Sequence, residues 1–340
     1  MKLVCFEIEA WEEEMLHSLC CSPDCTMVKT PLNIDNVASY AAAEIISCFI
    51  YSDLSRPVLE HLKNLKLITT RSTGFDHIDL NYCNKNGIAV ANVPAYGEHT
   101  VAEHVFALLL SLNRHIPQAV NQTRSGDFSL HNLRGFDLYG RTIGIIGTGV
   151  IGLHAARIAK GFGMNVLAYD VHPRADTDLS YVSLEELLGK SDIISLHVPG
   201  TAETHHMISD KEFSAVKDGV VIINTARGTV IDVKALLRAL QSGKVSAAGL
   251  DVLPEEPAIR EEAELLRASF TQQHDLETLL VDHALLHHKN VIVTPHSAFY
   301  TKDAIEKILR TTGENIVSFT AGRPQNIVNH SPSTQRKTAK

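Results

Sequence analysis

The chain has 340 residues, which is more than one typical domain contains and enough for two. Its formal net charge of −8 does not favour nucleic acid as a partner, and we expect none. The longest apolar stretch, Val105–Leu112, is far too short to cross a bilayer, so we also expect no membrane segment.

Six cysteines, all in the first quarter of the chain, bear on where the protein works. The sequence opens into a strand-like run, Lys2–Ile8, rather than a signal peptide, so we expect reduced thiols in a cytoplasmic protein. The cluster Cys20-Cys21-x3-Cys25 lacks the spacing of a usual zinc site, and no second ligand pair follows it. We therefore expect no bound metal.

The first hundred residues alternate between apolar runs and amphipathic stretches. This alternation predicts a parallel sheet with helices on both faces. No Gly-x-Gly-x-x-Gly motif occurs here, so this part is not expected to bind a dinucleotide. The predicted strands are Lys2–Ile8, Met27–Thr30, Glu44–Ile50, Leu67–Thr70 and Ile88–Asn92, with amphipathic stretches such as Arg56–Lys63 and Ile78–Lys85 between them.

Two long helices are predicted from apolar residues at helical spacing. The first runs from Glu98 to about Gln122 as one continuous helix, and a polar loop, Ser125–Arg141, follows it. The second, Thr301–Ala321, comes after the last predicted strand and is expected to return to the first domain.

A glycine-rich turn lies near the middle of the chain, in the sequence TIGIIGTGVIG of residues 142–152. Gly147, Gly149 and Gly152 form Gly-x-Gly-x-x-Gly between a short apolar strand and a helical stretch, the context in which this motif binds dinucleotides. The first glycine permits a tight turn, the second lets a pyrophosphate approach, and the third lets the helix pack closely. The N–H groups at the start of the helix would hold the phosphates.

A second apolar run, Asn165–Tyr169, ends at Asp170, 23 residues after Gly147. This is close to the spacing of about 20 residues expected for an acid that binds the adenosine ribose hydroxyls. A carboxylate there repels a 2′-phosphate, which favours NAD over NADP, although the nearby Arg174 leaves NADP open.

Four further strands of this half end in polar or small residues. Because ligands of doubly wound sheets sit at the carboxyl ends of the strands, we expect these ends to line one crevice beside the glycine turn. The strands are Ile193–His197, Val220–Asn224, Ala247–Leu250 and Val291–Thr294. Between two of them, a helix Val233–Ser242 is expected to begin after Asp232 as its N-cap.

Three side chains near these strand ends could carry out chemistry on an acid substrate. The planar guanidinium of Arg227 suits a carboxylate, and His296 can exchange a proton near neutral pH. Glu256 could bond the imidazole and favour its charged form. Spacing alone does not decide for His296, which is one of 18 histidines, and a lone arginine or glutamate is more often a solvated charge.

The motifs GTGVIG, HVPGTAETHHMI, INTARG, DVLPEEP and TPHSAFYT together resemble the D-isomer-specific 2-hydroxyacid dehydrogenase family, in order from about residue 44 to 328. TRSTGFDHIDL and NVPAYGEHTVAEH are similar to its D-lactate dehydrogenase branch. The resemblance implies an α/β fold of two Rossmann-like, doubly wound parallel-sheet domains. It places a discontinuous, flavodoxin-like substrate domain at 1–97 and 299–330 and an NAD-binding domain at 98–298, and we expect 331–340 to be a disordered tail.

The resemblance also implies roles for residues that match the family's motifs. Arg227 would bind the substrate carboxylate, and Glu256 and His296 would form the proton-donating pair. Asp251 would orient the nicotinamide carboxamide. The implied substrate-binding residues are Thr73, Gly74, Tyr96, Phe299 and Tyr300, and the other implied cofactor-binding residues are Gly147, Gly149, Val150, Ile151, Gly152, Asp170, Val198, Pro199, Thr204 and Thr225.

We therefore predict an NAD-dependent dehydrogenase, usually a homodimer in this family, that interconverts pyruvate and D-lactate. Reduction of hydroxypyruvate, glyoxylate or a bulkier 2-ketoacid is the alternative, although Tyr96 and the aromatic pair after His296 favour a small apolar substituent. A non-enzymatic, NAD-sensing binding protein is a further alternative. The 34 residues between Glu256 and Val291 are more than in many family members, with helical leucine spacing in their later part.

Overall fold

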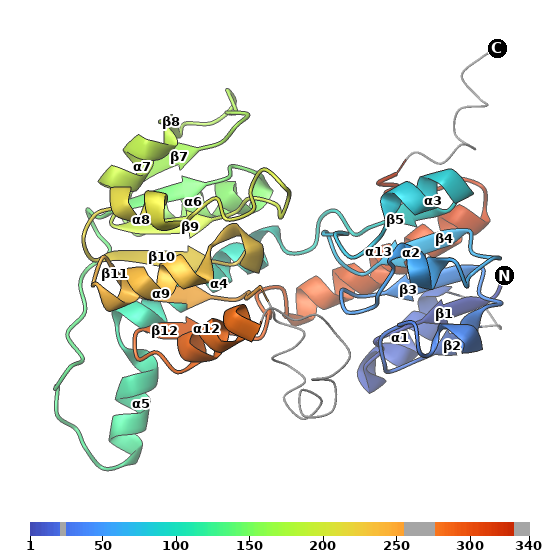
Figure 1. Cartoon of the computed structure of the whole chain (residues 1–340), viewed down its shortest axis with the longest axis horizontal. Coiled ribbons are helices and arrows are strands. Elements are labelled where there is room, and N and C mark those ends of the chain that lie inside the picture. The colour runs from blue at the N-terminus through green and yellow to red at the C-terminus, as the bar shows by residue number, and fades with distance from the viewer. Residues whose placement is uncertain (21–24, 255–275, 330–340) are drawn as a thin grey trace. The chain divides into compact units, whose positions relative to one another are not determined.

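The computed structural model describes residues 1–20, 25–254 and 276–329. The chain divides into two compact units (Figure 1). The first comprises Met1–Tyr96 and Thr301–Lys340, and the second is Gly97–Tyr300. The predicted tail, 331–340, lies outside the described residues.

The first unit is built on a five-stranded sheet with the order β2-β1-β3-β4-β5, in which every neighbouring pair is parallel. Every residue of β3 and β4 is buried, as expected for central strands covered on both faces. The strands are β1 (Leu3–Cys5), β2 (Cys25–Met27), β3 (Ile45–Cys48), β4 (Leu67–Thr70) and β5 (Ala89–Ala91). The helices are α1 (Ala10–Cys20), η1 (Val37–Tyr40), α2 (Arg56–Leu59), α3 (Leu80–Asn86) and α13 (Lys302–Thr320).

Helix α13 belongs to this unit although it lies at the far end of the sequence. Thr301 caps it by accepting a hydrogen bond from the N–H of Ala304, and the helix packs against α1 and β4. Inside the unit, Asn315 Nδ2 donates to the carbonyl of Asn92 at 2.9 Å. This bond ties the helix to the chain just after β5.

The second unit contains a seven-stranded parallel sheet with the order β12-β11-β10-β9-β6-β7-β8. Its strands are β6 (Thr142–Ile146), β7 (Asn165–Tyr169), β8 (Ser180–Tyr181), β9 (Ile193–Leu196), β10 (Val220–Asn224), β11 (Val245–Leu250) and β12 (Val291–Val293). Its helices are α4 (Glu98–Asn113), α5 (Ile116–Arg124), α6 (Val150–Gly161), α7 (Leu184–Lys190), α8 (Asp210–Ala215), η2 (Gly228–Val230), α9 (Val233–Gln241) and α12 (Leu276–Leu286).

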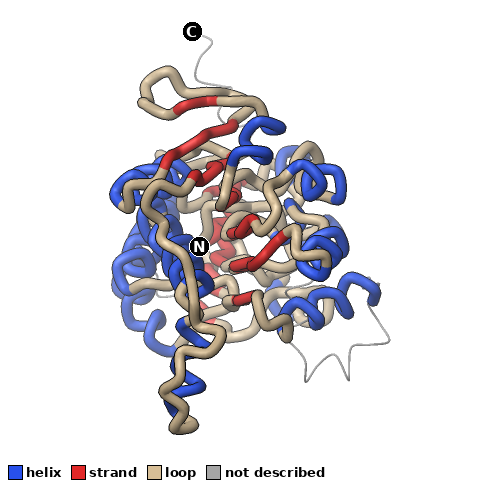
Figure 2. The backbone as a smooth tube through the Cα atoms, turned by 90° about the vertical axis from the view of Figure 1, so that its left-hand side faces the viewer, coloured by secondary structure: helices blue, strands red, loops and turns tan. Residues whose placement is uncertain are grey.

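Helices flank both faces of this sheet (Figure 2). Two apolar clusters fill the space between the strands and these helices. Along β10, Val220 and Ile222 belong to one cluster, whereas Val221 and Ile223 belong to the other. Successive side chains of a strand point to opposite faces, so a run of apolar residues serves both clusters. The doubly wound α/β fold predicted for this part of the chain is confirmed.

The single helix predicted from Glu98 to Gln122 is wrong, because the chain forms two helices here. Helix α4 ends at Asn113, and His115 then adopts a left-handed backbone conformation with φ 49°. Pro117 lies in the first turn of α5, where its missing N–H leaves no helical hydrogen bond unmade. Its ring would clash with a helical turn before it, so α4 cannot continue through this position. The expected loop over Ser125–Arg141 is confirmed.

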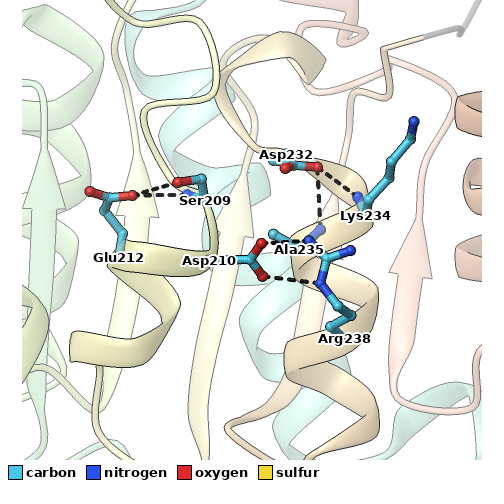
Figure 3. Close-up of polar contacts among 7 residues, drawn as sticks. All are labelled: Ser209, Asp210, Glu212, Asp232, Lys234, Ala235 and Arg238. Atoms are coloured by element: carbon cyan, nitrogen blue, oxygen red, sulfur yellow. Dashed lines mark hydrogen bonds and ion pairs between the residues drawn. The ribbon is translucent and has the colours of Figure 1, made fainter.

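Local capping explains why α8 and α9 begin where they do (Figure 3). Asp232 accepts hydrogen bonds from the N–H groups of Lys234 and Ala235 at 2.9 and 3.2 Å, which confirms it as the N-cap of α9. A bidentate ion pair between Arg238 and Asp210 joins the two helices. Within the described ranges, no helix combines the length and the apolar character needed to span a membrane.

Candidate active site

The glycine turn between β6 and α6 uses each of its three glycines differently. Gly147 has φ 93°, and a Cβ there would lie 2.6 Å from the carbonyl oxygen of His197. A Cβ on Gly152 would overlap the carbonyl oxygen of Gly147. A Cβ on Gly149, in contrast, would meet no atom within 4 Å. The first and third glycines are thus required by the turn itself, and the second leaves open space in front of it.

Helix α6 begins directly after that open space. Gly149 is its N-cap and has no side chain to cap it, and Val150 and Ile151 are the first helical residues. The first N–H groups of an α-helix have no partner within the helix and carry a partial positive charge. This turn therefore has the backbone donors and the room that a pyrophosphate needs.

Asp170 stands beside the turn, at the end of β7. Its carboxylate accepts hydrogen bonds from Thr148 N at 2.6 Å, Thr148 Oγ1 at 3.0 Å and His172 N at 2.8 Å. Burial raises the pKa of Asp170, but these donors outweigh it and hold the pKa below its ordinary value. The carboxylate is therefore ionised at neutral pH. Arg174, which left NADP open, forms an exposed ion pair with Asp176.

The loop after β9 meets both the glycine turn and the loop after β10. Val198 packs against Gly147, and Gly200 lies so close to Arg227 that a Cβ there would be 2.9 Å from its Cγ. The hydroxyl of Thr204 donates to the carbonyl of Pro199 at 2.5 Å and closes this loop. The loops after β9 and β10 therefore meet beside the glycine turn, and a crevice lined by all four strand ends stays a prediction.

Arg227 follows β10, where a buried asparagine fixes its backbone. Asn224 Nδ2 donates to the carbonyl of Arg227 at 2.9 Å, and Asn224 Oδ1 accepts from the N–H of Ala226 at 3.0 Å. The Nη1 group of Arg227 donates to the carbonyl of Ala226 at 2.8 Å. Between them, the buried hydroxyl of Thr225 has no hydrogen-bond partner among the described residues. An unsatisfied hydroxyl at a strand end fits a site that a polar ligand completes.

His296 follows β12 and is held in the left-handed backbone region, with φ 51°. Its N–H donates to the carbonyl of Asp251 at 2.9 Å. The Asp251 carboxylate accepts from Thr294 Oγ1 at 2.5 Å and from the N–H groups of Ser297 and Ala298, both at 2.9 Å. Asp251 thus binds the loop that carries His296, a role that the sequence did not predict.

The remaining predicted residues are placed as follows. Thr73 Oγ1 donates to the carbonyl of Val93 at 2.9 Å in the first unit, and Gly74 is next to it. Tyr96 is the last residue of that unit's first segment. Near the end of the second unit, the Phe299 and Tyr300 rings lie edge to face with centroids 5.9 Å apart. Glu256 lies outside the described residues, and the roles of all these residues stay predictions.

Sequence reasoning missed His104 on α4. Its Nε2 lies 3.1 Å from Thr294 Oγ1 and 3.4 Å from Asp251 Oδ1. Helical periodicity marks His104 only as a polar position, and no local motif connects it with residues about 150 and 190 positions later. Its proximity to Asp251 follows from how α4 packs on the sheet.

Comparisons with known proteins identify the family. Residues 106–298 match the model of the D-isomer specific 2-hydroxyacid dehydrogenase, NAD binding domain. D-lactate dehydrogenase of Escherichia coli is 40% identical over 286 residues, covering 82% of this chain and 84% of that protein. Glyoxylate reductase of Korarchaeum cryptofilum is 37% identical over 281 residues, covering 80% and 78%. The crystal structure of D-lactate dehydrogenase from Aquifex aeolicus with NAD and lactic acid has a TM-score of 0.87 at 38% identity, covering 97% and 99%.

A doubly wound unit with this glycine turn and an ionised acid beside it has the features of a dinucleotide-binding domain. The chain belongs to the D-isomer-specific 2-hydroxyacid dehydrogenase family, and it is an NAD-dependent enzyme. The predicted family, fold class and cofactor are confirmed.

Proposed function

We propose that this protein reduces pyruvate to D-lactate with NADH. The observation that carries the proposal is the placement of Arg227 and His296 at the same edge of one sheet. Arg227 follows β10 and His296 follows β12, and only β11 lies between these strands. Adjacent strands are about 4.8 Å apart, so β10 and β12 are separated by about 10 Å, a distance that two long side chains and a small acid can fill. The similarity to the E. coli D-lactate dehydrogenase supports pyruvate in particular.

In this proposal, each side chain has one task. The guanidinium of Arg227 binds the substrate carboxylate through two parallel hydrogen bonds and polarises the keto oxygen. The imidazolium of His296 donates a proton to that oxygen, and the neutral imidazole removes it in the reverse direction. Glu256 favours the charged imidazole. Bound NADH supplies the hydride.

The second unit is the proposed NAD-binding domain. The N–H groups of Val150 and Ile151 bind the pyrophosphate, and Asp170 binds the adenosine ribose. The open space at Gly149 and the unsatisfied hydroxyl of Thr225 support this placement. The further proposed cofactor contacts are Gly147, Gly152, Val198, Pro199, Thr204 and Asp251.

The first unit is the proposed substrate domain, in which the backbone of Thr73 and Gly74 binds the carboxylate. Tyr96, Phe299 and Tyr300 are proposed to restrict the substrate side chain to a small apolar group. The similarity to a glyoxylate reductase supports glyoxylate as the second candidate.

The test is NADH oxidation with pyruvate, 2-ketobutyrate, 2-ketoisocaproate, phenylpyruvate, hydroxypyruvate and glyoxylate, with NADPH in parallel. Pyruvate should give the highest kcat/KM, with D-lactate as the product. If hydroxypyruvate, glyoxylate or a bulky ketoacid leads, the preference for pyruvate is wrong. NADH binding without turnover of any of these acids would favour a non-enzymatic, NAD-sensing binding protein.

We also propose that the protein is a homodimer in the cytoplasm. Phe128, Leu130 and Tyr139 on the loop after α5 are 80%, 85% and 82% exposed, and we propose that a second copy covers them. Changing Phe128 and Leu130 to Asp should convert a dimer to a monomer in sedimentation experiments, and a monomeric wild type would contradict the proposal.

A further inference from the structure

Helix α4 lies unusually close to β11 because of Gly249. A Cβ on Gly249 would lie 3.0 Å from Leu108 Cβ and 3.2 Å from Leu112 Cδ1. His104 is one helical turn before Leu108, and Asp251, the first residue after β11, is two residues after Gly249. Because α4 packs closely on β11 at Gly249, one turn earlier in the helix His104 lies beside Asp251.

The polar contacts at this point have a defined direction. The ionised Asp251 carboxylate can only accept, so the hydroxyl of Thr294 donates its single proton to Oδ1 across 2.5 Å. The oxygen of Thr294 is then an acceptor for His104 Nε2, 3.1 Å away. This chain of bonds requires the proton of His104 to be on Nε2. It runs from His104 through Thr294 to Asp251.

The Asp251 carboxylate also bonds to the loop that carries His296. Its side chain is 0% exposed, and it accepts from the N–H groups of Ser297 and Ala298 as well as from Thr294. Burial raises the pKa of Asp251, but its donors, His104 and Thr294 first among them, hold the pKa below its ordinary value. The carbonyl of the same residue accepts from the N–H of His296, whose left-handed backbone is unfavourable for most residues with a Cβ.

We infer that His104 and Thr294 are positioning residues of the reaction, which orient the Asp251 carboxylate and through it hold the imidazole of His296 at the substrate. The inference rests on the proposed role of His296 as proton donor. Because neither His104 nor Thr294 is proposed to touch substrate or cofactor, their loss should lower kcat much more than it weakens NADH binding. Catalysis is this sensitive because a small displacement of the imidazole disrupts proton transfer.

Two matched pairs of variants test this. Thr294→Val removes the hydroxyl and keeps the shape, whereas Thr294→Ser keeps the hydroxyl. His104→Leu removes the donor, whereas His104→Gln places an amide donor near the position of Nε2. Each variant is assayed for kcat and KM with pyruvate, for NADH binding by fluorescence titration, and for its unfolding midpoint.

Thr294→Val and His104→Leu should lower kcat about tenfold, the size expected for losing one hydrogen bond, with the Kd for NADH within about twofold of wild type. Thr294→Ser and His104→Gln should restore most of the activity. Unchanged kcat in Thr294→Val and His104→Leu would overturn the inference while the proposed reaction stands. Weakened NADH binding or a lowered unfolding midpoint without a change in kcat would also overturn it, because the residues would then have a structural role. A wild type that reduces no 2-ketoacid would refute the proposed function first, and the inference with it.

Discussion

At the glycine turn, replacing Gly152 or Gly149 by alanine should have different effects. In Gly152→Ala the new methyl group overlaps the carbonyl oxygen of Gly147, a backbone atom that cannot move without moving the turn. Overpacking of this kind costs about 1–3 kcal/mol, so the free energy of unfolding should fall by about that amount. Urea unfolding of the protein without cofactor measures it.

Gly149→Ala is the matched control. Gly149 has φ −61° and ψ −175°, which any residue adopts, and its Cβ would meet no atom within 4 Å. Stability should therefore be unchanged or rise by up to about 1 kcal/mol, because alanine restricts the unfolded chain. The methyl group would instead occupy the space assigned to the pyrophosphate.

The Kd for NADH of Gly149→Ala should consequently rise. A clash of about 1–3 kcal/mol corresponds to about 5- to 150-fold weaker binding, measurable by fluorescence titration. Wild-type affinity in Gly149→Ala would refute the placement of the pyrophosphate at this turn. Wild-type stability in Gly152→Ala would refute the packing argument.

Three further predictions concern charge. Arg227→Lys should lower kcat/KM for pyruvate by about 10- to 150-fold, because an ammonium cannot replace the bidentate pairing, with NADH affinity unchanged as the check. Asp170→Asn should weaken NADH binding and reduce the ratio of the affinity for NADH to that for NADPH. Parallel titrations with the two cofactors measure this. Burial lowers the pKa of His197 to about 4, from an ordinary value of 6.5. As the pH falls, His197 therefore binds a proton in the unfolded chain before it does so in the folded protein. Stability should therefore fall between about pH 6.5 and pH 4, by up to about 3 kcal/mol from this group, and urea midpoints of His197→Gln should vary less across that range.

Local chemistry explains which parts of the fold were predictable. The turn at Gly147, the cap of α9 at Asp232 and the buried β10 each depend on a few consecutive residues, and all three were predicted from them. The break between α4 and α5 was missed, although Pro117 is visible in the sequence. The apolar periodicity of the sequence continues past Pro117. That pattern was given more weight than the restriction that proline places on a helical backbone.

The site was less predictable because its order depends on contacts between distant segments. Asp251 was predicted only as a cofactor ligand, since nothing in its neighbourhood shows that the loop at His296 bonds to it. His104 was missed for the same reason. Both depend on how closely α4 approaches β11 at Gly249, which is a property of the packed unit. Glu256 stays a prediction, because it lies outside the described residues.

The most direct test of the proposed reaction is the turnover of His296→Asn with pyruvate and NADH, beside wild type. Asparagine tolerates the left-handed backbone at this position, so the variant should fold and bind NADH with nearly wild-type affinity. We expect wild type to form D-lactate and the variant to lose about 100- to 10,000-fold in kcat, the usual contribution of a general acid. A variant that turns over pyruvate at the wild-type rate, or a wild type that forms L-lactate, would contradict the account.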